Sequence, residues 1–287
     1  MIIVTGATGR LGSLIVDRLL ARVPAEQIGV SVRDVDRAAP LAARGVRVRA
    51  GDFTAPATLE KAFEDADQVL LVSTSIRGKK AFPANKAAVD AARAAGAKRI
   101  LYTSHQACSP ASLFPPQGTH AATERCLADS GVPFTALRNG FYASTLGYYV
   151  GAALETGRLA LPQDGPVSWT AHEDLADAAA AALADAAALD GVTPPLTASQ
   201  ALDFGEVAAV LGELTGRTIE RVVVDDEEWT AAAIAQGVDP EAAAFTLSMF
   251  RAARAGEFTV TDPTLENVIG HPPVTARRVL EDLVHAA

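Results

Sequence analysis

The first half of the chain alternates short apolar runs with segments of helical periodicity. Residues 2–4 form a continuous β-branched run, Ile-Ile-Val, which is typical of a strand buried on both faces of a parallel sheet. A glycine-rich turn follows, and leucine and isoleucine then recur at helical spacing between residues 11 and 19. The same cycle repeats, which predicts strands over 28–32, 46–49, 69–72, 100–103 and 134–137 and helices over 36–43, 56–63, 85–95 and 123–130.

Glycine and threonine mark several of these boundaries. Gly96 and Gly131 each follow a predicted helix, as helix-terminating glycines do, and Thr54 is the predicted N-cap of the helix over 56–63. Six strands with helices between them predict a doubly wound, parallel α/β sheet of the Rossmann type, covered on both faces.

The alternation changes after residue 138. We interpret residues 1–140 as a dinucleotide-binding domain and 141–287 as a smaller, mostly helical substrate domain. No linker separates the two, so we expect them to be interleaved, with part of 165–187 returning to the main sheet. The pattern predicts a helix ending over 152–157, strands over 167–170 and 219–224, and helices over 173–187, 201–215, 227–235, 240–255 and 275–284.

Charge and cysteine content narrow the class of protein. The 287 residues carry 25 basic and 34 acidic side chains, a net charge of −9, which argues against nucleic acid or an anionic membrane surface as a partner. Cys108 and Cys126 are too few for a disulfide framework and are expected to be reduced thiols in the cytoplasm. The start of the chain lacks a signal-peptide pattern, and the alanine-rich stretch over 176–188 is interrupted by aspartates. We therefore expect a cytoplasmic protein, and a homodimer is left open.

The motif that carries the most chemistry lies between the first strand and the first helix. Its glycines have the spacing G-x-x-G-x-x-G, which allows a tight turn, a close approach of backbone to a pyrophosphate and close packing of helix on strand. The free N–H groups at the start of the helix then favour phosphate binding. The predicted cofactor-binding residues of this turn are Gly6, Ala7, Thr8, Gly9, Arg10, Leu11 and Gly12.

The end of the second predicted strand indicates which cofactor is bound. An acidic side chain about 20 residues after the glycines suits the ribose hydroxyl of NAD, whereas a basic one suits the 2′-phosphate of NADP. Arg33 and Asp34 are adjacent here, and neighbours on a strand point in opposite directions. We favour Arg33 and NADPH, with NADH as the alternative.

Other strand ends should line the same crevice, because ligands bind at the carboxyl edge of such sheets. The alternative is that these small hydroxyl residues only begin loops. The predicted contacts along the adenine, ribose and nicotinamide are Asp52, Phe53, Ser73, Thr74, Ser75, Thr103 and Ser104.

At this point the chain resembles the NmrA-like branch of the atypical, extended short-chain dehydrogenases/reductases. That branch includes type 2 NAD(P)H:quinone oxidoreductases and triphenylmethane dye reductases. The resemblance covers nearly the whole chain and rests on residues 5–12, 32–34, 91–98, 102–104, 120–124, 137–142 and 269–273.

The resemblance implies that NADPH is held by the glycine turn and Arg33, and that the C-terminal domain covers the substrate cleft. It further implies that the segment of Asn139, Gly140, Phe141 and Tyr142 closes on the nicotinamide. His120 and Tyr142 are the candidate catalytic residues, and the alternative is a surface histidine and a core aromatic. No metal-ligand spacing and no flavin motif stands out, so we expect neither.

The chain departs from the Tyr-x-x-x-Lys pattern of ordinary members of that superfamily. His120 stands at the lysine position, which places Pro116 at the tyrosine position, and proline cannot donate a proton. The favoured hypothesis is therefore hydride transfer to a small-molecule acceptor, a quinone or similar electron-poor conjugated compound, which needs little acid catalysis. The alternatives are a non-catalytic, NADP(H)-sensing regulator and, less favoured, a sugar-nucleotide epimerase.

Overall fold

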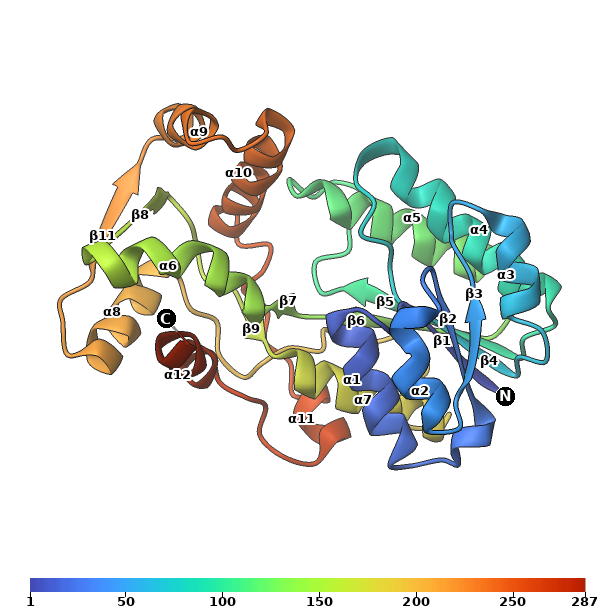
Figure 1. Ribbon diagram of the computed structural model, residues 1–287. Helices are drawn as coiled ribbons and strands as arrows, with labels where there is room; N and C mark the ends of the chain where they lie inside the picture. Colours follow the sequence, from blue (N-terminus) through green and yellow to red (C-terminus); the bar gives the residue numbers. More distant parts are fainter. Residues whose placement is uncertain (287) are drawn as a thin grey trace.

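A seven-stranded parallel sheet organises the computed structural model, which describes residues 1–286. The spatial order is β10-β6-β5-β4-β1-β2-β3, and every neighbouring pair runs parallel (Figure 1). The order reverses between β1 and β4, which creates the crevice where ligands of such sheets bind. The strands are β1 (Ile2–Thr5), β2 (Ile28–Val32), β3 (Arg47–Ala50), β4 (Gln68–Leu71), β5 (Arg99–His105), β6 (Phe134–Asn139) and β10 (Gly191–Val192).

Both faces of the sheet are buried, as the doubly wound prediction requires. Along β1, Ile2 and Val4 pack with the helices α1 and α7, whereas Ile3 packs with α3, α4 and α5 on the opposite face. The helices are α1 (Arg10–Leu20), α2 (Ala39–Ala43), α3 (Pro56–Ala62), α4 (Ala81–Ala94), α5 (Pro115–Asp129) and α7 (His172–Ala184), with 3-10 turns η1 (Ala25–Gln27), η2 (Asp36–Ala38) and η3 (Gly78–Lys80).

The C-terminal elements gather beside this sheet, on the left of Figure 1. Their core is aromatic, and the fully buried rings of Trp169, Phe204 and Phe250 contact one another. The elements are η4 (Ala143–Leu146), α6 (Gly147–Thr156), β8 (Arg158–Pro162), α8 (Phe204–Thr215), β11 (Glu220–Val224), α9 (Asp226–Ala235), α10 (Pro240–Arg254), α11 (Thr264–Ile269) and α12 (Ala276–Ala286).

The segment over 165–187 does not add a strand to the main sheet. Its strand β9 (Trp169–Thr170) pairs with β7 (Phe141–Tyr142) in a separate two-stranded sheet, and its helix α7 packs against α1. The strand that returns to the main sheet is β10, next to β6. The part of 165–187 that reaches the main sheet is α7, which shares a buried core with β1 and β5. A Gly-Val pair is too short to give a period-2 pattern, so periodicity does not reveal β10.

The N-cap of α3 and the start of α5 differ from the predicted ones. Thr54 does not cap α3: the N-cap is Ala55, and Thr54 instead donates its N–H and its hydroxyl to Asp52, both at 2.8 Å. Helix α5 begins at Pro115 rather than near residue 123, because proline is well suited to the first helical position. The loop after β5 therefore ends at Phe114, before the helix.

The loop between β5 and α5 is fastened to the C-terminal elements. Gln106 donates to the carbonyl of Phe258 at 3.1 Å, and Leu113 N–H donates to the Glu257 carboxylate at 2.8 Å. Within residues 1–286, no helix combines the length and the apolar character that crossing a bilayer requires.

Candidate functional site

Two cavities meet at the carboxyl edge of the sheet. The glycine-turn cavity, of about 760 Å³, lies over β1, the turn after it and the ends of β2 and β3. The His120 cavity, of about 680 Å³, lies between the starts of α4 and α5 and the side chain of Phe245 on α10. The segment over 73–76, which follows β4, lines both cavities. The two cavities are therefore neighbours that share this segment.

The glycine turn has the geometry of an anion site. Gly6 has a positive φ of 62°, and Gly9 N–H donates to its carbonyl at 2.9 Å. A Cβ on Gly12 would stand 2.2 Å from the Gly6 carbonyl oxygen, so only glycine lets α1 approach the strand this closely. Helix α1 has no side-chain cap and no acidic residue in its first turn, so its N–H groups and positive dipole end are left for a ligand. Such an end fits the pyrophosphate of a dinucleotide.

Side-chain partners distinguish Arg33 from Asp34. The Asp34 carboxylate accepts the N–H of Asp36 at 3.1 Å and so begins η2. The Arg33 guanidinium lines the cavity and makes no hydrogen bond or ion pair within residues 1–286. Arg10 and Arg37 line the same cavity, which gives it three cations. A free arginine beside two others fits a 2′-phosphate better than a ribose hydroxyl.

Two residues predicted to lie beside the adenine are brought to the glycine-turn cavity. Asp52 and Phe53 both line it. Hydrogen bonds from the backbone and side chain of Thr54 lower the pKa of Asp52, and the Arg33 charge acts in the same direction. Sequence reasoning missed other lining residues at the same strand ends and turns, namely Ser31, Val32, Arg37, Thr54, Val72 and Ile76.

Thr103 and Ser104 line neither cavity, since both are buried beneath the crevice. Thr103 Oγ1 accepts the N–H of Ser73 at 2.8 Å and so holds the shared segment in place. Ser104 donates to the carboxylate of Glu124 at 2.6 Å, and Glu124 forms a two-point ion pair with Arg138. These residues fix β5, α5 and β6 relative to one another. Ala7, also predicted to bind the cofactor, is buried in the core.

Two buried polar atoms, one at the last residue of β6 and one at the first residue of α7, have no hydrogen-bond partner within the described chain. Asn139 is buried, and its Oδ1 has no hydrogen-bond partner within the described chain. The Tyr142 ring stacks on His172, with centroids 4.3 Å apart, and His172 Nδ1 is also buried without a partner among residues 1–286. Burial and the nearby Arg10 lower the pKa of His172 to about 4. Two unsatisfied buried polar atoms are unusual in a folded chain and mark a place where a polar ligand group fits.

Gly140 and Phe141 serve packing at this point of the chain. A Cβ on Gly140 would stand 2.1 Å from Thr170 Oγ1, so β7 approaches β9 closely. Phe141 belongs to an aromatic cluster with Trp169 and Phe258, at ring-centroid distances of 5.5 and 5.0 Å. The cluster holds the segment that carries Asn139 and Tyr142 against the C-terminal core.

A chain of hydrogen bonds sets the protonation of His120. The Thr74 N–H donates to Asn85 Oδ1 at 3.3 Å, so the amide nitrogen of Asn85 faces inward. That nitrogen donates to Tyr102 Oη at 3.2 Å and to Thr123 Oγ1 at 3.3 Å. His120 Nδ1, 2.8 Å away, is the one acceptor that the buried Tyr102 hydroxyl contacts within residues 1–286, so the phenol proton is directed to it. In neutral His120 the ring proton is therefore on Nε2.

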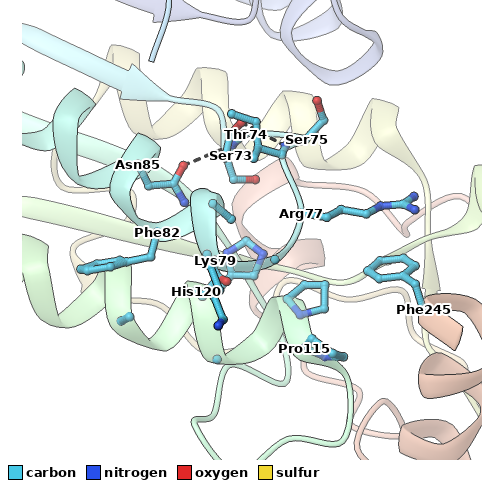
Figure 2. A pocket seen from close by; sticks show the side chains of 17 residues that line it. Ser73, Thr74, Ser75, Arg77, Lys79, Phe82, Asn85, Pro115, His120 and Phe245 are labelled. Carbon is cyan, nitrogen blue, oxygen red and sulfur yellow. Dashed lines mark hydrogen bonds between the residues drawn. The ribbon is translucent and has the colours of Figure 1, made fainter. Parts of the chain in front are cut away.

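His120 lines the cavity in this neutral form. Burial lowers its pKa to about 4, although Glu124 opposes the shift. Nδ1 is turned toward Tyr102, which leaves the Nε2–H as the donor available to a ligand in the cavity (Figure 2). His105 lies close behind, with its ring centroid 6.0 Å from that of His120, and hydrogen-bonds Gln117 through Nδ1 at 2.7 Å.

Comparison with known proteins decides the family. The profile of the NmrA-like family matches residues 1–273. The chain belongs to the NmrA-like family. It is 34% identical over 278 residues to quinone oxidoreductase 2 of Escherichia coli, covering 96% of both chains. It is 32% identical over 280 residues to the NAD(P)H azoreductase of Xenophilus azovorans, covering 96% of this chain and 95% of the relative.

Solved structures extend the similarity to the whole fold. The triphenylmethane reductase of Citrobacter sp. complexed with NADP(H) has a TM-score of 0.92 and 32% identity, covering 99% of this chain and 100% of that one. The NADPH-dependent quinone oxidoreductase of Escherichia coli complexed with NADPH has a TM-score of 0.92 and 32% identity, covering 100% of this chain and 99% of that one. The NmrA-like resemblance and the Rossmann-type fold predicted from the sequence are thus confirmed.

The lining of the His120 cavity is the part of this NmrA-like chain that sequence reasoning largely missed. Of the residues that the sequence nominated, His120, the segment of Ser73, Thr74 and Ser75, and the stretch of Pro115, Pro116 and Thr119 line it. Since the other residues come from separate elements and carry no motif, no local pattern could bring them together. They are Ile76, Arg77, Gly78, Lys79, Ala81, Phe82, Asn85, Gly118, Ala122 and Phe245.

Proposed function

We propose that this protein is an NADPH-dependent reductase that transfers a hydride directly to a quinone or a similar electron-poor conjugated acceptor. NAD(P)H-dependent oxidoreduction is the activity of the relatives that it matches over their whole length. The observation that carries the finer proposal is the junction of the two cavities through residues 73–76. A dinucleotide over the glycine turn then has its reactive end beside a cavity that is partly walled by rings and contains the neutral imidazole of His120.

The cofactor part of the proposal rests on the glycine-turn cavity. The uncapped start of α1 binds the pyrophosphate, and the unpaired Arg33 binds the 2′-phosphate. Asn139 Oδ1 is a buried acceptor without a partner in the described chain, and it fits the amide N–H of the nicotinamide carboxamide. When bound, NADPH supplies a hydride to the acceptor and leaves as NADP⁺.

The protein's own contribution to the acceptor step is positioning and one hydrogen bond. Addition of a hydride to a quinone places negative charge on a ring oxygen, and one proton from solvent then completes the hydroquinone. The Nε2–H of His120 donates to that oxygen as its charge develops. Because His120 is neutral above about pH 5, it stabilises this charge as a hydrogen-bond donor and not as an imidazolium.

The absence of a tyrosine donor is consistent with this chemistry. Pro116 and His120, which occupy the positions of the tyrosine and lysine in the related dehydrogenases, both line the cavity one helical turn apart. A quinone is already a strong electrophile, so orientation over the cofactor lowers the barrier more than a strong acid would. The role of Tyr142 follows from its stacking on His172: it is proposed to pack beside the nicotinamide.

The deciding experiment is NADPH oxidation with 1,4-benzoquinone, compared with NADH and with a control that lacks quinone. We expect turnover that depends on the quinone and favours NADPH. The His120→Ala variant should lose about ten- to a hundred-fold in kcat, and His120→Gln should regain part of it, because the glutamine amide can also donate. Tight NADPH binding without turnover of any quinone or dye would overturn the proposal in favour of a cofactor-sensing regulator.

A further inference from the structure

The His120 cavity combines positive charge with the absence of carboxylates. Arg77 and Lys79 lie at its rim, and none of the described residues that line it is an aspartate or a glutamate. This contrasts with the chain as a whole, whose net charge is −9. Neither Arg77 nor Lys79 forms an ion pair or a side-chain hydrogen bond within residues 1–286. The two charges are therefore available to a ligand.

Arg77 is also held in a defined place. Its guanidinium carbon lies 4.1 Å from the centroid of the Phe245 ring, a cation–π contact between the segment after β4 and helix α10. Stacking uses the flat face of the guanidinium and leaves the N–H groups at its edge free to donate. Figure 2 shows the stacked pair on one side of the cavity, with Phe82 on the other side and His120 between them.

Much of the remaining wall is apolar and rich in rings. Phe82, Pro115, Pro116 and Phe245 all line the cavity, together with Ile76. Such walls favour a flat aromatic compound, which they can contact from more than one side. The two cations at the rim favour a ligand with a negatively charged substituent, which a neutral quinone lacks.

We propose that the acceptor is an aromatic compound with an acidic substituent, a sulfonate or a carboxylate, which Arg77 and Lys79 bind while the conjugated ring lies beside His120. This inference rests on the proposed reductase function and specifies its substrate class. It predicts discrimination against cationic dyes, whose charge would meet two cations at the rim.

The cofactor has its own set of cations. Arg10, Arg33 and Arg37 line the glycine-turn cavity, which Arg77 and Lys79 do not. The phosphates of a dinucleotide can thus be neutralised without the rim of the His120 cavity, and the rim charges are left for the second substrate.

The test compares 1,4-naphthoquinone with its 2-sulfonate, which share the ring and differ in charge. For each enzyme, kcat/KM with NADPH is measured for both compounds, and their ratio is taken so that intrinsic reactivity cancels between variants. We expect Arg77→Gln and Lys79→Gln each to lower the sulfonate-to-neutral ratio by about three- to ten-fold. The charge control is Lys61→Gln, on α3 and outside both cavities, and it should leave the ratio unchanged.

Salt and a cationic dye give independent readouts. Raising the ionic strength should lower kcat/KM for the sulfonate more than for the neutral quinone. Crystal violet, a cation, should be a poorer substrate than the sulfonate, and Arg77→Gln should reduce that difference.

The possible outcomes distinguish a failure of the reductase function from a failure of the anionic-acceptor inference. If neither naphthoquinone is reduced, the reductase function itself is wrong. If both are reduced and the ratio is the same in wild type and rim variants, only the anionic-acceptor inference fails. It also fails if the rim variants change the KM for NADPH and not the ratio, because the cations would then belong to the cofactor site.

Discussion

Arg33 and Asp34 are adjacent just after β2, and of the two side chains only that of Asp34 has a hydrogen-bond partner within the described chain. The sequence alone could not separate the two, because either side chain is able to contact a ribose. The separation comes from η2, whose first turn takes the Asp34 carboxylate as an acceptor. If Arg33 binds the 2′-phosphate as proposed, cofactor preference is set partly by a short 3-10 turn that lies outside the glycine motif.

Replacement of Arg33 by alanine tests this assignment. We expect NADPH binding to weaken by about 1.5–3 kcal/mol, since a hydrogen-bonded charge is lost, and NADH binding to change little. Dissociation constants from titration of cofactor fluorescence would measure both. An equal loss for the two cofactors would contradict the assignment of Arg33 to the 2′-phosphate.

Tyr102→Phe tests the orientation of His120. The change removes the proton that holds Nδ1 as an acceptor, so the imidazole should become a mixture of tautomers. The buried amide of Asn85 also loses a partner, at a cost of about 1–3 kcal/mol in unfolding free energy. Nitrogen chemical shifts of the imidazole, followed against pH, would report the tautomer.

Tyr149→Phe is the matched control, because its hydroxyl makes no hydrogen bond within residues 1–286. It should leave the His120 signals unchanged. A wild-type spectrum with the ring proton on Nδ1 would refute the derived hydrogen-bond chain.

At the scale of elements, the close approach of α1 to β1 depends on a single missing side chain. Gly12→Ala places a Cβ against the Gly6 carbonyl, so the turn must shift. We expect a loss of about 1–3 kcal/mol in unfolding free energy, as in other overpacked sites, together with weaker cofactor binding. Urea denaturation and cofactor titration would measure the two effects.

Gly151→Ala on α6 is the comparison, since a Cβ added there would meet no atom within 4 Å. This change should raise stability by about 0.5–1 kcal/mol, because alanine is the better helix former. Should Gly12→Ala behave like Gly151→Ala, the close packing of α1 on the glycine turn would be incorrect.

The elements that could be predicted well from the sequence are those with a strong hydrophobic pattern. Buried strands such as β1 and β2 and the glycine turn carry local signals, because burial on both faces demands continuous apolar runs. β10 and the start of α5 were not predicted from the sequence. A two-residue strand has no periodicity, and the segment Pro-Pro-Gln-Gly does not have a helical pattern. Much of the His120 cavity was not predicted for a different reason: Arg77, Phe245 and Phe82 meet only through tertiary packing.

The whole molecule should lose stability as the pH falls below neutrality. Burial lowers the pKa of His120 and His172 to about 4, and that of His105 well below its ordinary value. The unfolded chain takes up these protons near pH 6.5, whereas the folded chain resists them. Stability is therefore fully present above about pH 6.5 and declines toward pH 4, by at most about 1.4 kcal/mol per pH unit for each histidine. Asp174, whose pKa is raised by burial, partly opposes the decline.

Urea denaturation at intervals between about pH 7.5 and 4.5 would measure the decline. His172→Phe keeps a ring against Tyr142 and removes one titrating group, so it should flatten the pH dependence by about a third. An unchanged slope in that variant would show that His172 is protonated normally in the folded protein.

The packing of α7 on α1, and of β10 on β6, has a consequence for protein engineering. The cofactor-binding helix is covered by residues from the second half of the chain, which also supplies the outer strand of the sheet. A crossover near residue 140 between this chain and a relative would therefore graft a foreign surface onto α1 and a foreign strand onto β6. Chimeras intended to exchange acceptor specificity should keep residues 172–192 with their own N-terminal half and exchange α8 to α10 instead.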